Sequence, residues 1–106
     1  MAWVSLVAAG LLEVVWAYFM KQSAGFSRLW PSVATIVFMV ASFGLLAYSM
    51  RTLPLSTSYV VWTGIGAVGA FAVGIIVMNE PATLLRILAA MLIVTGLLLM
   101  KAASGH

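Results

Sequence analysis

The hydrophobic residues of the chain are gathered into four long stretches, which short polar segments separate. Each stretch is close to the roughly 20 residues that an α-helix needs to cross a bilayer. Because the segments between them are short, neighbouring helices are expected to run antiparallel. The pattern therefore predicts an all-α integral membrane protein, a four-transmembrane-helix bundle in one domain over residues 1–106, with spans at about 3–20, 31–50, 55–77 and 83–100.

The composition supports this prediction and excludes most classes of enzyme. Of 106 residues, 65% are hydrophobic and 7% are charged, and the mean hydropathy is +1.22. Cysteine and aspartate are absent, and His106 is the single histidine. This excludes disulfides, thiolate metal sites, a Ser-His-Asp relay and a cage of several carboxylates. We therefore expect no enzymatic activity, no cofactor and no metal, and the five scattered cations form no basic stripe for nucleic acid.

One acidic residue, Glu13, lies in the middle of the first apolar stretch. Ten residues separate it from Trp3, which places it roughly 15 Å along a helix. A bilayer core is roughly 30 Å thick, so this carboxylate is expected near the middle of the membrane. A charge at that depth costs at least about 2.5 kcal/mol, and such residues usually belong to functional sites. We therefore interpret Glu13 as the central candidate for a functional residue in this chain.

Aromatic and hydroxyl side chains are expected around this carboxylate. Trp16 follows Glu13 by one turn and offers an indole N–H and a π face. Tyr59 and Trp62 share one face of the third span, and Ser42 lies deep in the second. Tyrosine and tryptophan also occur as interfacial anchors, but Trp16 and Trp62 lie too deep for that role. Ser42 is expected either to donate to the carboxylate or to bond its own helix.

Small residues mark positions where helices approach one another closely. Gly10 shares the helix face of the carboxylate, and Gly64 and Gly66 are candidates for a bend or a close contact in the third span. Ala89 and Gly96 in the fourth span are interpreted as packing positions, and they are candidates for a dimer seam.

The charges at the two ends of the bundle are almost balanced. Arg51 and Lys101 lie at one end, and Lys21, Arg28 and Arg86 lie at the other. Since orientation follows a bias in positive charge, so small a bias predicts dual topology, in which the same chain inserts both ways. An antiparallel homodimer would then bring two central carboxylates to one site at the midplane. The alternative is a single orientation that helix packing determines.

Four segments of the chain carry a recognisable pattern. They are Gly10-Leu-Leu-Glu13-Val-Val-Trp16-Ala-Tyr-Phe-Met-Lys21, Gly25-Phe-Ser-Arg28-Leu-Trp-Pro31-Ser, Tyr59-Val-Val-Trp62-Thr-Gly64-Ile-Gly66 and Asn79-Glu80-Pro81. These segments resemble the small multidrug resistance family, and the resemblance covers essentially the whole chain. The tryptophan and alanine after the glutamate, with the Asn-Glu-Pro loop, are similar to the guanidinium-exporter subtype. Family members usually have Gly-Thr-Ala before the tyrosine and Ala after it, where this chain has Ser56-Thr57-Ser58 and Val60.

The resemblance implies a proton-coupled antiporter in the inner membrane of a prokaryote, which works as an antiparallel dual-topology homodimer. It implies that Glu13 of both subunits binds protons or a guanidinium-like cation in alternation, surrounded by Trp16, Ser42, Tyr59 and Trp62. Low dielectric and a like-charged neighbour both favour protonated carboxyls, and the two groups would titrate as a coupled pair. Protons and a cation would therefore compete for the same pair of groups.

Other functions remain as alternatives. A relative of this family could export a broader range of quaternary ammonium cations, or could move lipid-linked or polyamine substrates with a different partner chain. A passive channel or a packing subunit of a larger membrane complex is the alternative outside the transporters. Proton-coupled uptake of guanidinium, compared with a bulky aromatic cation, distinguishes these alternatives.

Overall fold

The computed structural model describes residues 2–104, so His106 lies outside the described part of the chain. Four helices make up nearly all of it, and over the described residues there is no strand. All four are long and apolar enough to cross a membrane. The predicted all-helical membrane fold is therefore confirmed, with α1 over Ala2–Gln22, α2 over Leu29–Ser49, α3 over Leu55–Met78 and α4 over Leu84–Ser104.

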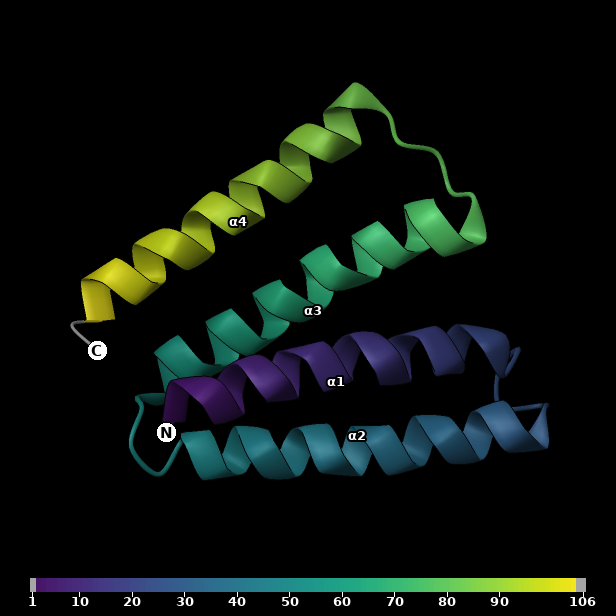
Figure 1. Cartoon of the computed structure of the whole chain (residues 1–106), viewed down its shortest axis with the longest axis horizontal. Helices are drawn as coiled ribbons and strands as arrows, with labels where there is room; N and C mark the ends of the chain where they lie inside the picture. Colours follow the sequence, from purple (N-terminus) through teal and green to yellow (C-terminus); the bar gives the residue numbers. More distant parts are fainter. Residues whose placement is uncertain (1, 105–106) are drawn as a thin grey trace.

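In the view of Figure 1, the helices run alternately up and down and are spread out as a layer. Across the layer the order is α4, α3, α1, α2, and the backbone of α4 contacts that of α3 alone. The Cα atoms extend over 42 × 34 × 16 Å, so the bundle is thinnest along the direction of view in Figure 1. Its buried core lies among α1, α2 and α3, where Leu6, Leu46 and Trp62 belong to one cluster. In contrast, no residue of Leu84–Ala103 on α4 is buried.

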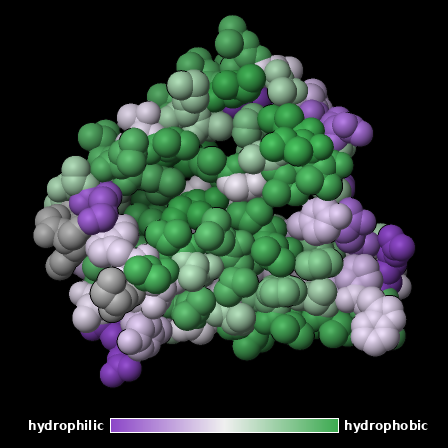
Figure 2. Space-filling model, in the orientation of Figure 1, coloured by the Kyte–Doolittle hydropathy of each residue, from purple (hydrophilic) through white to green (hydrophobic). Residues whose placement is uncertain are grey.

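The two ends of the layer carry the connections and the polar side chains. Both termini and the α2–α3 connection lie at one end, while the α1–α2 and α3–α4 connections lie at the other (Figure 1). Figure 2 shows a broad hydrophobic band between hydrophilic side chains at the two ends. Large apolar side chains such as Leu84, Leu92 and Ile76 are more than half exposed within that band. An apolar surface of this extent is suited to lipid or to a second protein chain.

Buried hydroxyl groups connect α2 to α1. Thr35, Ser42 and Ser49 recur every seven residues on α2, and all three are fully buried. The Ser42 hydroxyl donates to the Ala9 carbonyl at 2.7 Å, and the Ser49 hydroxyl lies 3.2 Å from the Ala2 carbonyl. The Ala2 and Ala9 carbonyls on α1 are also seven residues apart. The same serine-to-carbonyl contact therefore recurs after two turns along the antiparallel helices α1 and α2. These bonds hold the register of α1 against α2 and hence the depth of every residue on α1.

Candidate functional site

The Glu13 carboxylate lies against α3, in a notch that a glycine leaves open. A Cβ atom built on Gly66 would collide with the Glu13 carboxylate, so only glycine leaves this space for it. Glu13 Oε1 is buried and has no hydrogen-bond partner among the described residues. A buried oxygen without a partner is costly, which makes it rare in native proteins. The carboxylate is therefore positioned to bind a group that its own chain does not supply.

Ser42 connects three helices one turn away from this carboxylate. Its hydroxyl donates to the Ala9 carbonyl on α1 and accepts a hydrogen bond from Trp62 Nε1 on α3 at 3.0 Å. The expected donation from Ser42 to Glu13 is not present, because a hydroxyl has one hydrogen and Ala9 takes it. Ser42 also does not bond its own helix. It holds the Trp62 indole in place.

The aromatic residues form a chain of rings across the layer. The rings of Tyr59 and Trp62 on α3 have centroids 5.8 Å apart. Phe43 on α2 lies 5.6 Å from the Trp62 ring and 6.3 Å from that of Trp16 on α1, edge to face in both cases. Trp16 Nε1 is buried and has no partner among the described residues. The predicted aromatic residues therefore lie close to one another, and the indole N–H of Trp16 remains able to donate.

Phe43 is a member of this ring chain that the sequence analysis did not single out. It bridges two predicted site residues and is 46% exposed on the face of α2. The available signal was a mid-span aromatic residue directly after Ser42. That signal is weak, since phenylalanine is ordinary in membrane spans.

The glycines of α1 and α3 allow these helices to approach each other closely. A Cβ on Gly10 would lie 2.7 Å from Ile65 Cβ, and one on Gly64 would collide with the Leu97 side chain of α4. Gly64 and Gly66 thus serve contacts with different helices, α4 and α1. The α-helical hydrogen bonding of α3 continues from Leu55 to Met78, so the glycine pair does not interrupt the helix.

Ala89 and Gly96 lie on an exposed part of α4. Both are exposed, and nothing lies within 4 Å of a Cβ built on Gly96. Gly96 therefore has no contact within its own chain that would explain its small size, whereas Ala89 lies beside a hollow that Ala67 and Phe71 of α3 also line. Their predicted place in a dimer seam stays a prediction.

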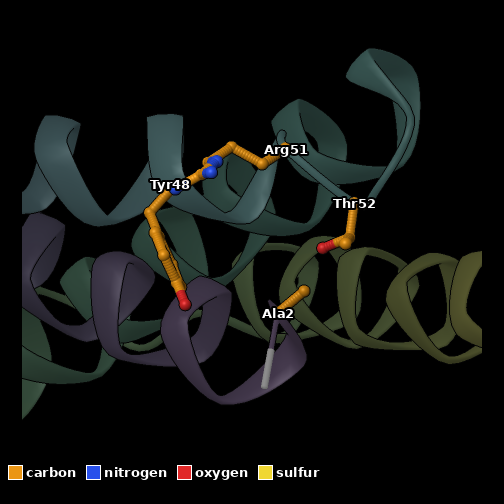
Figure 3. A pocket seen from close by; sticks show the side chains of 4 residues that line it. All are labelled: Ala2, Tyr48, Arg51 and Thr52. Carbon is orange, nitrogen blue, oxygen red and sulfur yellow. The ribbon is translucent and has the colours of Figure 1, made fainter.

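Two hollows lie away from the carboxylate. An almost entirely apolar hollow of about 340 Å³ lies between α3 and α4, with Tyr59 and Val60 in its wall. The hollow of about 310 Å³ in Figure 3 lies at the end of α2, where Tyr48, Arg51 and Thr52 surround it with Ala2. The hollow in Figure 3 shares no residue with the predicted site around Glu13.

Among the described residues, no group of three His, Cys, Asp or Glu side chains is arranged to hold a metal ion.

Comparison with known proteins identifies the relatives of this chain. Residues 1–105 match the family described as Small Multidrug Resistance protein. The guanidinium exporter of Yersinia pseudotuberculosis is 57% identical over 104 residues, which cover 98% of this chain and all of that one. The guanidinium exporters of Escherichia coli K12 and Salmonella typhimurium are each 52% identical, and they cover 95% and 100% of this chain. The chain aligns with these exporters over nearly its full length and shares half or more of its residues with them, and it belongs to the small multidrug resistance family.

Proposed function

We propose that this protein exports guanidinium and small guanidinyl cations in exchange for protons, across the inner membrane of a prokaryote. The relatives are named as exporters, so the chain is a multi-pass membrane transport protein and not an enzyme. Relatives 52–57% identical over nearly the full chain support guanidinium as the substrate. Their bacterial sources support the inner membrane as the location.

The observation that carries the coupling is the unpartnered oxygen of Glu13. This oxygen is buried against Gly66 and accepts no hydrogen bond from the described residues. A proton would neutralise the carboxylate, and a cation would balance its charge and fill its acceptor positions. A guanidinium ion is planar, with several N–H donors, and carboxylates match it in charge and geometry. Glu13 therefore binds either protons or the cation, and the two exclude each other.

The ring chain completes the proposed cation site. Trp16 offers an unused N–H and a ring face at one turn from Glu13, and Tyr59 and Trp62 offer further ring faces. Aromatic faces attract cations, most strongly where water is excluded. The Ser42 hydroxyl holds Trp62 in its orientation, so Ser42 positions the site without touching Glu13.

The exposed surface of α4 supports a two-chain transporter. No residue of Leu84–Ala103 is buried within its own chain, and the backbone of α4 contacts that of α3 alone. A second copy placed against it in the opposite orientation would enclose the two Glu13 carboxylates, as inverted repeats do in larger transporters. The exposed small residues Ala89 and Gly96 give α4 a surface for close packing with the partner.

The ends of the chain support insertion in both directions. Lys101 lies 4.5 Å from the Trp3 ring centroid and Arg51 lies 5.8 Å from that of Tyr48, both at the terminal end. Arg86 lies 5.5 Å from the Phe71 ring centroid at the other end. Each end therefore pairs cations with aromatic rings, and both are suited to either membrane interface.

Exchange in proteoliposomes tests the proposal. With an outward guanidinium gradient, the protein should move protons inward, and a proton gradient should drive guanidinium uphill. A bulky aromatic cation serves as the comparison substrate. Conductance of guanidinium without proton movement would indicate a channel, and stronger transport of the aromatic cation would indicate the broader quaternary ammonium exporter. No transport of either cation would contradict the proposed function.

A further inference from the structure

The second carboxylate of the chain, Glu80, lies between α3 and α4 beside a guanidinium group of the same chain. Arg86 Nη2 lies 3.8 Å from Glu80 Oε1, and Arg86 Nη1 donates to the Pro81 carbonyl at 2.9 Å. The Arg86 guanidinium carbon also lies 5.5 Å from the centroid of the Phe71 ring. A carboxylate, a carbonyl and an aromatic face are partners that any guanidinium ion can use. Glu80 and Pro81 thus already contact a guanidinium group, that of Arg86, and guanidinium is the proposed substrate of the protein.

The position of the Glu80 carboxylate is determined by the end of α3. Asn79 takes a left-handed conformation with φ of 57°, and the Glu80 N–H donates to the Gly74 carbonyl at 3.0 Å. A Cβ on Gly74 would collide with Glu80 Oε1, so glycine makes room for the carboxylate against the helix. The side chain is therefore folded back onto α3.

The pair between Glu80 and Arg86 is loose. At 3.8 Å its atoms are too far apart for a hydrogen bond, and each side chain is 41% exposed. Ion pairs at this level of exposure contribute little, because water and salt compete for both groups. A carboxylate has two oxygens and about four acceptor positions, and no described side chain donates a hydrogen bond to Glu80. The carboxylate can therefore accept a further cation.

A hollow connects Glu80 with the depth of the central site. It has a volume of about 220 Å³ and lies between α1 and α3, with Glu80 and Lys21 at the membrane end and Val14 at the other. The seven residues from Lys21 to Val14 span about 10 Å of helix. Val14 is the neighbour of Glu13 in the chain, and its side chain fills the space that Gly69 leaves open. The hollow thus extends from Glu80 to the chain neighbour of Glu13, and the Val14 side chain lies at its inner end.

We propose that Glu80 forms a second guanidinium site at the membrane end, a transit site that an arriving cation shares with Arg86 before it moves towards Glu13. The proposal rests on the proposed export of guanidinium and extends it to a second residue. Lys21 lines the same hollow, and its positive charge opposes entry. The site is therefore weak, and a weak site releases its cation readily.

Binding to the Glu13→Gln variant tests the site without the central carboxylate. Carbon-13 guanidinium is titrated onto the purified variant, and saturable broadening of its NMR signal reports weak binding. Adding Glu80→Gln should weaken this binding at least threefold. Adding Arg86→Gln should instead tighten it at least threefold, because the Arg86 guanidinium no longer competes with the free ion for Glu80. Arg28→Gln is the control, since it removes the same charge from the same end without touching Glu80. Binding that is not saturable, or that Glu80→Gln leaves unchanged, would overturn the proposal.

Transport separates this proposal from the proposed function. In otherwise unaltered protein, Glu80→Gln should raise the KM for guanidinium at least threefold with little change in the maximum rate. Damage to the loop would instead lower the maximum rate and the thermal stability. If the parent transports guanidinium and Glu80→Gln leaves KM unchanged, the transit site is wrong and the function stands. If the Glu13→Gln variant binds guanidinium through Glu80 but the parent does not transport it, the function is wrong and the site stands.

Discussion

The carboxylate of Glu13 occupies the space that a side chain on Gly66 would need. A carboxyl group of α1 and an absent side chain of α3 are therefore matched to each other, near the middle of the two helices. This match allows α1 and α3 to pack closely while the carboxylate stays between them. It also makes the size of residue 66 a determinant of where the carboxylate lies.

Gly66→Ala should displace the Glu13 side chain and abolish guanidinium transport. The added methyl overlaps the carboxylate, and such overpacking typically costs about 1–3 kcal/mol. Gly44→Ala is the matched control, because nothing lies within 4 Å of a Cβ at that position. The control should keep its transport rate and stay within about 1 kcal/mol of the parent in stability. Uptake assays and thermal unfolding in detergent measure both effects, and full transport by Gly66→Ala would contradict the match.

Glu13→Gln should leave a folded dimer but abolish proton-coupled exchange. The amide keeps the shape of the carboxyl but cannot alternate between a charged and a neutral form. In the parent, guanidinium binding should weaken as pH falls, since protons compete with the cation for the same oxygens. Binding titrations over a range of pH values, with size-exclusion chromatography as the check on the dimer, measure this. Coupled transport that continues in the variant would remove Glu13 from the mechanism.

Trp16→Gly should admit bulkier cations and weaken guanidinium transport. The indole fills the space one turn from the carboxylate, so its removal enlarges the site and deletes a ring face. Trp30→Gly is the control, because Trp30 is 77% exposed at the start of α2. Competition between guanidinium and a bulky aromatic cation measures the change in selectivity. If both activities were unchanged in Trp16→Gly, the tryptophan would serve packing alone.

The near-even charge of the two ends predicts that a C-terminal tag is found on both faces of the membrane in comparable amounts. Two lysines added to residues 51–54 should bias most chains to one orientation and lower activity, because antiparallel pairs can no longer form. Coexpression with a variant that carries two added lysines in residues 21–30 should restore activity. Both variants carry two added lysines. If the lysines themselves damaged the protein, coexpression would not restore activity, so restored activity shows that orientation was the cause of the loss. A tag confined to one face, with full activity, would exclude the antiparallel homodimer.

The helices could be read from the sequence because a membrane span leaves a simple signature, an apolar run of sufficient length. Glu13 could be found for the same reason, since a single charge within such a run is costly. Both predictions depend on composition along the chain and need no knowledge of how the helices pack.

The contacts between helices could not be predicted in the same way. A hydroxyl accepts and donates to whatever lies opposite, so the partners of Ser42 depend on the register of α1 against α2. Phe43 is an ordinary span residue until the structure places it between Trp16 and Trp62. The role of Gly74 likewise depends on the left-handed Asn79, which folds the following glutamate back onto α3.

The exposed face of α4 makes transport by the proposed antiparallel pair dependent on how crowded the chains are in their membrane. No residue of Leu84–Ala103 is buried within one chain, and the proposed two-carboxylate site forms only where two chains are associated. Dilution with excess lipid should therefore reduce the rate per chain, steeply below the density at which pairs dissociate. The cell could adjust export through the number of chains alone, because doubling a sparse population would more than double the number of working pairs.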